Sequence, residues 1–351
     1  MNLKQFNPMK ILNHWKTLNE IVSGKNPAPI SCEIDPSNYC NHDCIWCING
    51  NYRENNLEML SKERLFSIID QLADMRVKSI TFTGGGEPLT NPAVLDALKK
   101  VRRGKMETAL VTNGSLLDEE KSKVIINTCS FVRISLDAAG NNIYNKLHRP
   151  KGKGKKNFDK VISNLKTLVE LRRAAKKKTT IGVAYLVHPL NYHQIYDAAK
   201  LVKKIGVDYI QVRPVFMGGA QLSGKIWFET ERLMQDALGL RDKSFHVFPI
   251  LHRFDEVINM DKGYDVCRGH RTLGVIGANG KVYLCCQFRG VDKFCFGDLN
   301  KQTFKEIWNG RERQLAIKNI SLDKCPPCRY NKYNELLDYL ADKERPHKNF
   351  L

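Results

Sequence analysis

Short apolar stretches alternate along this chain with longer amphipathic ones. The short stretches are rich in β-branched and aromatic residues and predict six strands, at 30–34, 78–83, 108–112, 131–136, 181–187 and 209–215. The longer stretches carry apolar residues every three or four positions and predict five helices, at 61–75, 93–101, 117–127, 158–175 and 192–205. Repeated strand–helix units form a parallel sheet with helices outside it, so we expect an α/β fold built as an open or partial barrel.

The length and composition allow one large domain and a smaller one. Of the 351 residues, 42% are hydrophobic, which is enough to bury a full core. The pattern divides the chain into an N-terminal extension, a barrel, a cysteine-rich domain and a tail, at 1–29, 30–240, 241–335 and 336–351. No stretch approaches ~18 uninterrupted apolar residues, and the N-terminus lacks the apolar segment of a signal peptide. We therefore expect a cytoplasmic protein without a membrane partner.

The chain is strongly basic, with a formal net charge of +19, and part of this charge lies in two runs, 151–156 and 172–178. Such runs occur on proteins that bind nucleic acids. The second run, however, lies at the end of the predicted helix 158–175, where cations complement the helix dipole. Neither run is interleaved with the aromatic residues that stack on bases. We expect no nucleic-acid partner, and a small polar or anionic substrate is compatible with the positive charge.

Three cysteines, Cys40, Cys44 and Cys47, follow the first predicted strand with the spacing C-x3-C-x2-C. A structural zinc ion takes four ligands, whereas a 4Fe–4S cluster held by three cysteines leaves one iron open. The spacing resembles the signature of the radical S-adenosylmethionine (radical SAM) enzymes, and Trp46 fits that pattern. The resemblance implies a partial (β/α)6 barrel and S-adenosylmethionine bound at the open iron. The alternatives are a partial zinc site or three unrelated core thiols.

A glycine run, Gly84, Gly85 and Gly86, follows the second predicted strand and is followed by Glu87. Glycines at such a place let the backbone approach a ligand without obstruction by side chains. Downstream of the three cysteines, the run resembles the GGE motif of radical SAM enzymes. The resemblance implies that the glycine backbone and the Glu87 carboxylate hold the α-amino group of S-adenosylmethionine.

Polar residues follow the later strands, at the edge where parallel α/β sheets bind their ligands. The resemblance implies that Ser135 and Asp137 contact the ribose or the carboxylate of the cofactor, and that Arg149 pairs with the carboxylate. Asn113 is either a cofactor contact or an ordinary turn residue. Arg213, at the end of the sixth predicted strand, either binds substrate or forms a structural salt bridge.

The last third of the chain holds six further cysteines, Cys267, Cys285, Cys286, Cys295, Cys325 and Cys328. By spacing alone they could ligate zinc. The surrounding sequence resembles the SPASM/Twitch extensions of radical SAM enzymes, which hold an auxiliary 4Fe–4S cluster. No cysteine follows Cys328, so we expect a single auxiliary cluster of the Twitch type. The resemblance implies as its ligands Cys267, Cys285, Cys325 and Cys328. Cys286 and Cys295 either replace one of these ligands or are core thiols.

The resemblance also implies a reaction. An external donor such as flavodoxin or ferredoxin would reduce the first cluster, which would cleave S-adenosylmethionine to a 5'-deoxyadenosyl radical. That radical would abstract hydrogen from a small polar substrate of the sugar, aminocyclitol or nucleoside type, and the auxiliary cluster would accept an electron. Arg213, Asp265 and His270 are candidates for moving the proton. The alternatives are a peptide maturase, an RNA-modifying enzyme and, in another class, a non-catalytic protein that binds zinc and nucleic acid.

Overall fold

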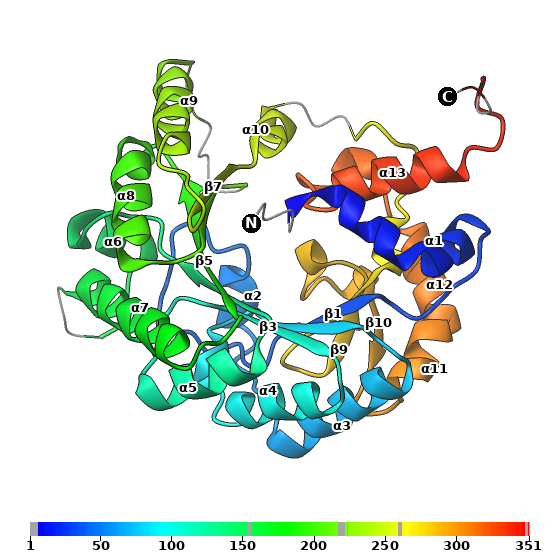
Figure 1. Ribbon diagram of the computed structural model, residues 1–351. Coiled ribbons are helices and arrows are strands. Elements are labelled where there is room, and N and C mark those ends of the chain that lie inside the picture. Colours follow the sequence, from blue (N-terminus) through cyan, green and yellow to red (C-terminus); the bar gives the residue numbers. More distant parts are fainter. Residues whose placement is uncertain are drawn as a thin grey trace.

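One continuous sheet runs through the computed structural model, which describes residues 6–152, 156–216, 222, 224–258, 262–347 and 350 (Figure 1). The strand order is β10-β9-β8-β1-β2-β3-β4-β5-β6-β7. The strands are β1 (Ser31–Ile34), β2 (Ser79–Phe82), β3 (Glu107–Thr112), β4 (Phe131–Ser135), β5 (Thr180–Val187), β6 (Tyr209–Pro214), β7 (His246–Pro249), β8 (Leu273–Ile276), β9 (Lys281–Tyr283) and β10 (Cys295–Asp298). From β8 through β1 to β7 all neighbours are parallel, whereas β9 and β10 run antiparallel. The expected partial barrel is confirmed. Residues 153–155 of the first basic run lie outside the described part.

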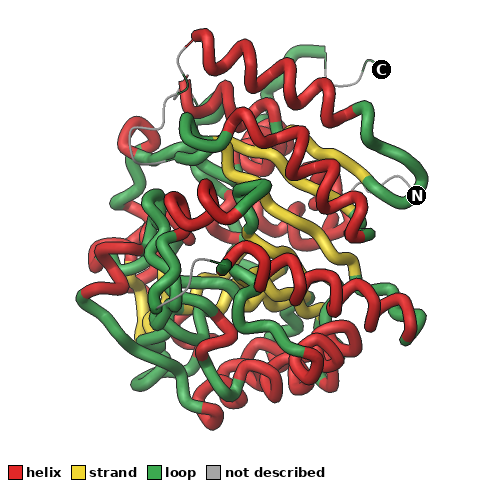
Figure 2. Tube along the Cα trace, turned by 90° about the vertical axis from the view of Figure 1, so that its left-hand side faces the viewer, coloured by secondary structure: helices red, strands yellow, loops and turns green. Residues whose placement is uncertain are grey.

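Five helices cover the outer face of the parallel strands, and Figure 2 shows the strands inside this helical layer. They are α3 (Lys62–Asp74), α4 (Val94–Arg103), α5 (Glu119–Thr128), α7 (Asn157–Ala174) and α8 (Ile195–Ile205). Side-chain caps set two of the starts: Ser61 accepts a hydrogen bond from the Arg64 N–H, and Asp118 accepts one from the Lys121 N–H. All five helices were predicted, with bounds that differ by at most three residues, because amphipathic periodicity indicates where a helix lies better than where it ends.

Eight further helices of the described residues were not predicted, and most of them lie outside the strand–helix repeat. They are α1 (Trp15–Val22), α2 (Gly50–Glu54), α6 (Asn141–His148), α9 (Gly224–Leu238), α10 (Leu251–Ile258), α11 (Phe304–Asn309), α12 (Arg311–Lys318) and α13 (Asn331–Ala341). The N-terminal and C-terminal segments pack together through Leu18 and Ile21 of α1 and Leu337 of α13 (Figure 1). No helix in the described ranges is long and apolar enough to cross a bilayer.

The cysteine-rich domain is joined to the barrel through the sheet. β8 pairs in parallel with β1, so the hairpin of β8 and β9 extends the barrel strands at one edge. At the other edge β7 pairs with β6, although it lies beyond residue 240, where the sequence pattern ends the barrel. The domain boundary at residue 240 therefore remains a proposal. Strands from both sides of this boundary belong to the same sheet.

Buried charges fasten the end of β1 to the cysteine-rich domain. The Glu33 carboxylate pairs with the guanidinium groups of Arg289, at 2.8 Å, and Arg329. Asp35, one residue past β1 and fully buried, lies 2.8 Å from Nε of the same Arg289. Arg289 also donates a hydrogen bond to the Cys286 carbonyl oxygen at 2.8 Å. This network holds the strand that leads into the three-cysteine segment.

We expect Arg289→Met to lower the free energy of unfolding by about 3–5 kcal/mol, because it leaves Glu33 and Asp35 buried without their shared partner. The measurement is urea unfolding of the anaerobically reconstituted protein, followed by circular dichroism. Lys62→Met is the matched control. It removes an exposed ion pair in which Lys62 Nζ lies 2.6 Å from the Asp96 carboxylate, and it should lower the free energy of unfolding by less than about 1 kcal/mol. Equal effects of the two variants would contradict a buried clamp.

Candidate functional site

The three cysteines Cys40, Cys44 and Cys47 lie in a loop that leaves β1 and closes on itself before α3. Ser37 and Met59 form an antiparallel bridge at its base, and all three thiols are half-buried. Burial raises the pKa of the Cys40 thiol to about 11 and raises that of Cys47, and the neighbouring Cys44 adds to both shifts. Cys40 and Cys47 thus both lie near Cys44, and ligation of a cation would favour the thiolate forms of Cys40 and Cys47. We call residues 35–61 the cluster loop.

The glycine run packs directly against the cluster loop. A Cβ on Gly85 would lie 2.1 Å from the Asn38 side-chain oxygen, and one on Gly86 would lie 2.1 Å from the Tyr39 carbonyl oxygen. The Gly86 N–H donates to the Ser37 carbonyl oxygen at 2.9 Å. Gly84 has a φ of +147°. These glycines therefore permit the approach of the loop backbone. The Gly86 N–H is already used in this bond, and an ammonium group needs hydrogen-bond acceptors. Binding of the α-amino group of the cofactor by the carbonyl oxygens of the glycine run therefore remains a prediction.

Glu87 connects the glycine turn to the end of β3. Its carboxylate is buried and accepts hydrogen bonds from the Thr112 hydroxyl at 2.6 Å, the Asn113 N–H at 2.8 Å and the Leu89 N–H at 3.1 Å. Burial raises the pKa of Glu87, and the bonds from Asn113 and Thr112 oppose that rise. A carboxylate has about four acceptor positions, of which three are occupied here. The contact of Glu87 with the α-amino group of a cofactor stays a prediction. The structure shows that Glu87 accepts hydrogen bonds from the end of β3.

Asn113 holds the turn after β3 and contacts the cluster loop. Its amide oxygen accepts hydrogen bonds from the Ser115 N–H and hydroxyl, at 3.0 and 2.7 Å. Its amide nitrogen lies 2.8 Å from the Asn41 side-chain oxygen and 2.7 Å from Nδ1 of His42. Burial, with the nearby His148, lowers the pKa of His42 to about 3, so this imidazole is neutral. Asn113 is thus a turn residue that also positions the loop, and a direct cofactor contact stays a prediction.

Asp137 faces the cluster loop through His148, a histidine that the sequence analysis did not single out. Its carboxylate lies 3.2 Å from His148 Nε2, and His148 Nδ1 lies 3.3 Å from the Cys44 sulfur. The second carboxylate oxygen accepts a hydrogen bond from the Leu186 N–H at 2.5 Å. Asp137 is 1% exposed and has a φ of +53°. A hydrogen bond to a ligating sulfur would stabilise a reduced cluster, so His148 is placed to act on a cluster that Cys44 would ligate.

The remaining predicted cofactor residues surround the same loop. Ser135 ends β4 and is half-buried. Arg149 is exposed, follows α6 with a φ of +42°, and its carbonyl oxygen accepts a hydrogen bond from the Asp43 N–H at 3.1 Å. Trp46 is buried against the rings of His148 and His188. The structure brings all the predicted cofactor residues to one end of the barrel, and their contacts with S-adenosylmethionine stay predictions.

A second cysteine site lies in the C-terminal domain. One apolar cavity is lined by the four predicted ligands, Cys267, Cys285, Cys325 and Cys328. Burial raises the pKa of the Cys328 thiol to about 12, and Cys285 and Cys267 add to this, as expected for thiols that lie together. Neither Cys286 nor Cys295 lines the cavity: the Cys295 thiol donates to the Gly297 carbonyl oxygen at 3.6 Å. The donor set fits a fully ligated iron–sulfur cluster.

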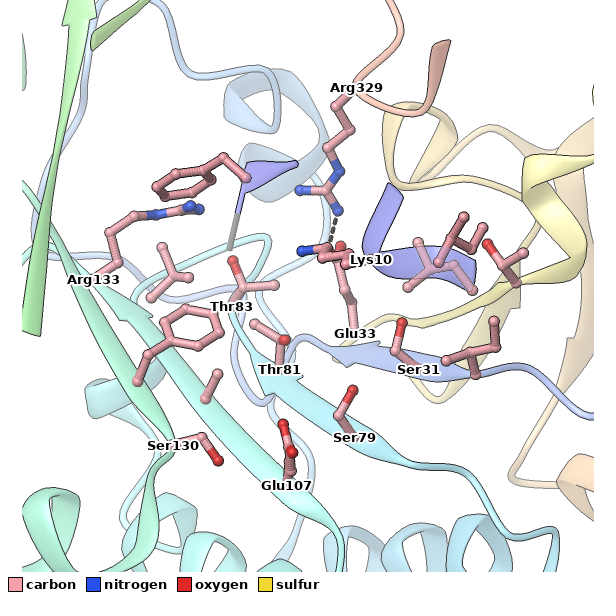
Figure 3. A pocket seen from close by; sticks show the side chains of 18 of the residues that line it. Lys10, Ser31, Glu33, Ser79, Thr81, Thr83, Glu107, Ser130, Arg133 and Arg329 are labelled. Atoms are coloured by element: carbon pink, nitrogen blue, oxygen red, sulfur yellow. Dashed lines mark hydrogen bonds and ion pairs between the residues drawn. The ribbon is translucent and has the colours of Figure 1, made fainter. Parts of the chain in front are cut away.

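The lumen of the barrel forms a cavity of about 670 Å³ (Figure 3). Alternate residues of β1 to β6 line it, and Arg253 of α10 and Arg329 and Tyr330 of the cysteine-rich domain also face it. It extends to Thr83, directly before the glycine run. Leu273 and Tyr330 line both this lumen and the four-cysteine cavity. Only a wall of side chains therefore separates the two.

The three candidates for proton transfer lie in different places. Arg213 lines the lumen. His270 is buried beside the four-cysteine cavity, with Nδ1 3.3 Å from the Arg313 guanidinium, and burial lowers its pKa well below the usual value. Asp265 is exposed and lines neither cavity. Arg133, which was not predicted from the sequence, shares the lumen with Arg213. The sequence pattern could have indicated it: Val132 and Ile134 face the outer helices, and side chains alternate along a strand, so residue 133 must face the lumen.

Two sequence profiles match the chain: that of the Radical SAM superfamily over residues 34–202, and that of the SPASM iron–sulfur cluster-binding domain over residues 267–330. A tungsten-containing aldehyde ferredoxin oxidoreductase cofactor-modifying protein of Pyrococcus furiosus is 22% identical over 326 residues, 84% of this chain and 86% of that protein. An AdoMet-dependent heme synthase of Methanosarcina barkeri is 24% identical over 317 residues, with the same coverage of each chain.

Solved structures share the fold. Streptococcus suis SuiB bound to its precursor peptide SuiA superposes with a TM-score of 0.63 at 19% identity, over 90% of this chain and 72% of that one. The protein anSMEcpe with bound AdoMet superposes with a TM-score of 0.62 at 21% identity, over 88% of each chain. The profiles coincide with the two cysteine sites, one at the start of the barrel and one beyond it. The chain belongs to the radical SAM superfamily and carries a C-terminal SPASM iron–sulfur cluster-binding domain.

Proposed function

We propose that this radical SAM enzyme is an oxidoreductase that removes hydrogen from a small polar substrate in the barrel lumen and passes an electron to an auxiliary 4Fe–4S cluster. When bound, the first cluster and S-adenosylmethionine supply a 5'-deoxyadenosyl radical that abstracts the hydrogen. The observation that carries the proposal is that Leu273 and Tyr330 line both the lumen and the four-cysteine cavity. A substrate in the lumen would lie next to its electron acceptor.

The two cysteine sites suit different tasks. Cys40, Cys44 and Cys47 supply three ligands, which leaves one iron for the cofactor. Cys267, Cys285, Cys325 and Cys328 supply four, which leaves no position for a substrate and suits electron transfer. The single auxiliary cluster and this ligand set are part of the proposal.

The lumen favours a small substrate over a folded or extended one. Its volume of about 670 Å³ lies within the range of small-molecule pockets, roughly 300–1,000 Å³. Phe6 and Lys10, from the segment that precedes α1, also line it (Figure 3 labels Lys10). A peptide maturase is the alternative, since a peptide could place one side chain in the lumen.

Replacing Cys40, Cys44 and Cys47 together with alanine should abolish 5'-deoxyadenosine formation, because these thiols create the open iron. The reconstituted wild-type protein should hold about eight iron atoms per chain and the variant about four. Chromatography of the nucleoside and iron analysis measure the two quantities. Continued cleavage of S-adenosylmethionine by the variant would show that the reactive cluster lies elsewhere.

Replacing Cys325 and Cys328 with serine should leave 5'-deoxyadenosine formation largely intact while product formation stops, because the substrate radical cannot pass on its electron. The assay incubates the enzyme with a small-molecule fraction and a peptide fraction of a cell extract, and mass spectrometry seeks a product that lacks two hydrogen atoms. A product in the peptide fraction would support the maturase instead.

Cys295→Ser is the matched control for this variant, since Cys295 belongs to the same domain and lies outside the cavity; it should keep both the iron and the product. The double variant must first be shown to be soluble and to bind S-adenosylmethionine, because loss of a metal site also lowers stability. Undiminished product formation by that variant would make the second cluster structural.

A further inference from the structure

The lumen carries more positive than negative charge. It is lined by five lysine or arginine side chains and two glutamates: Lys10, Arg133, Arg213, Arg253, Arg329, Glu33 and Glu107. Glu33 is already paired with Arg289 and Arg329. Glu107 is the exposed first residue of β3. Neither glutamate forms an ion pair with Arg133, Arg213 or Arg253 in the described part of the chain, so the charge of these three arginines remains uncompensated by the lumen itself.

The same three arginines have unused hydrogen-bond donors. Within the described residues, no hydrogen bond or ion pair reaches the Arg213 guanidinium, and its Nε is buried without a partner. Arg133 donates only to the Gln211 side-chain oxygen, at 3.3 Å, and its Nε is likewise buried and unpartnered. Arg253 is 8% exposed, its Nη1 is buried without a partner, and its Nε lies 3.9 Å from the Glu256 carboxylate. Buried donors of this kind normally find an acceptor.

The strand register brings these arginines around one space. Arg133 on β4 pairs with Gly182 on β5, and Arg213 on β6 pairs with Leu186 two positions further along β5. Between them β5 presents Ala184, and the Tyr209 ring of β6 lies over Gly182. The Ile250 N–H donates to the Val212 carbonyl oxygen at 2.9 Å, which places the start of α10, and with it Arg253, beside the end of β6.

All three arginines line the same cavity, and their like charges repel one another. Burial, followed by the charges of Arg133 and Arg253, lowers the pKa of Arg213 to about 9. Like charges at one place destabilise a fold, and an anion between them would reverse that effect. Guanidinium groups bind carboxylates and phosphates through paired N–H donors.

We propose that Arg133, Arg213 and Arg253 form a binding site in the lumen for an oxyanion group of the substrate, a carboxylate or a phosphate. The proposal deepens the proposed function and rests on it, since it assigns the negative group of the molecule that enters the lumen. It gives Arg213 a binding role, because a guanidinium that stays charged at neutral pH suits an anion better than it suits proton removal.

The test measures binding of inorganic phosphate and of succinate to the anaerobically reconstituted holoenzyme by isothermal titration calorimetry. Wild-type protein should bind at least one of them, and the one that binds identifies the group. Arg213→Gln and Arg253→Gln should each weaken binding roughly 10- to 100-fold, the effect of losing a charge-assisted hydrogen bond. Arg213→Lys should retain part of the affinity. Arg102→Gln, the same change on the exposed face of α4, should bind as the wild type does.

If these arginines only stabilised the fold, the thermal midpoints of the variants would change differently. Removing the unpaired buried cation of Arg213 should leave the thermal midpoint of the anion-free protein unchanged or raise it, whereas loss of a structural contact would lower it. Saturating S-adenosylmethionine should leave phosphate or succinate binding intact. Competition between them would overturn the proposal, because it would assign the arginines to the cofactor carboxylate. Equal binding by the lumen variants and Arg102→Gln, or no binding by wild type, would also overturn it.

The wild-type preparation is assayed in parallel for 5'-deoxyadenosine, which separates the two proposals. Anion binding without cofactor cleavage would overturn the proposed oxidoreductase and leave the anion site in place. Cofactor cleavage without anion binding would overturn the anion site alone.

Discussion

The buried pairing of Glu33 and Asp35 with Arg289 and Arg329 is the constraint on which the rest of the structure depends. Glu33 lies near the end of β1, directly before the cluster loop. Arg289 and Arg329 follow Cys285 and Cys328 closely in sequence. One charge network therefore holds the strand that leads to the first cysteine site and the two segments that carry the second. Because Glu33, Asp35 and Arg289 are buried, each of these charges needs its partner to remain in place.

Around that anchor, hydrogen bonds position the cluster loop from three neighbouring strand ends. Glu87 connects the glycine turn to β3, Asn113 reaches the loop from β3, and Asp137 reaches it from β4 through His148. Several polar residues that resemble cofactor ligands in the sequence thus also support the segment that carries the cysteines. A residue can serve both tasks, since a site held by its own scaffold is a more exact site.

The sequence predicted the barrel well because its strands and outer helices follow two regular periods, as in α3 and α7, whose apolar stripes face the sheet. It did not predict α9, which continues the repeat between β6 and β7, nor α10 and α13, which lie outside the repeat; α13 packs against the distant α1. Cysteine spacing indicated both cysteine segments, and the four C-terminal ligands that the family resemblance implied line one cavity. Asp265 and His270 could not be placed from spacing, because side-chain direction in an irregular segment is set by tertiary contacts.

The pairing of β8 with β1 has a consequence for electron transfer. Tunnelling between redox centres slows steeply as their separation grows, so a hinge between two domains would make the rate depend on how often they meet. Here the C-terminal domain shares a hydrogen-bonded sheet with the barrel, and packed sheets do not open as hinged domains do. If the proposed function holds, the distance from a substrate in the lumen to the auxiliary cluster is set by the backbone of the shared sheet and does not depend on domain closure.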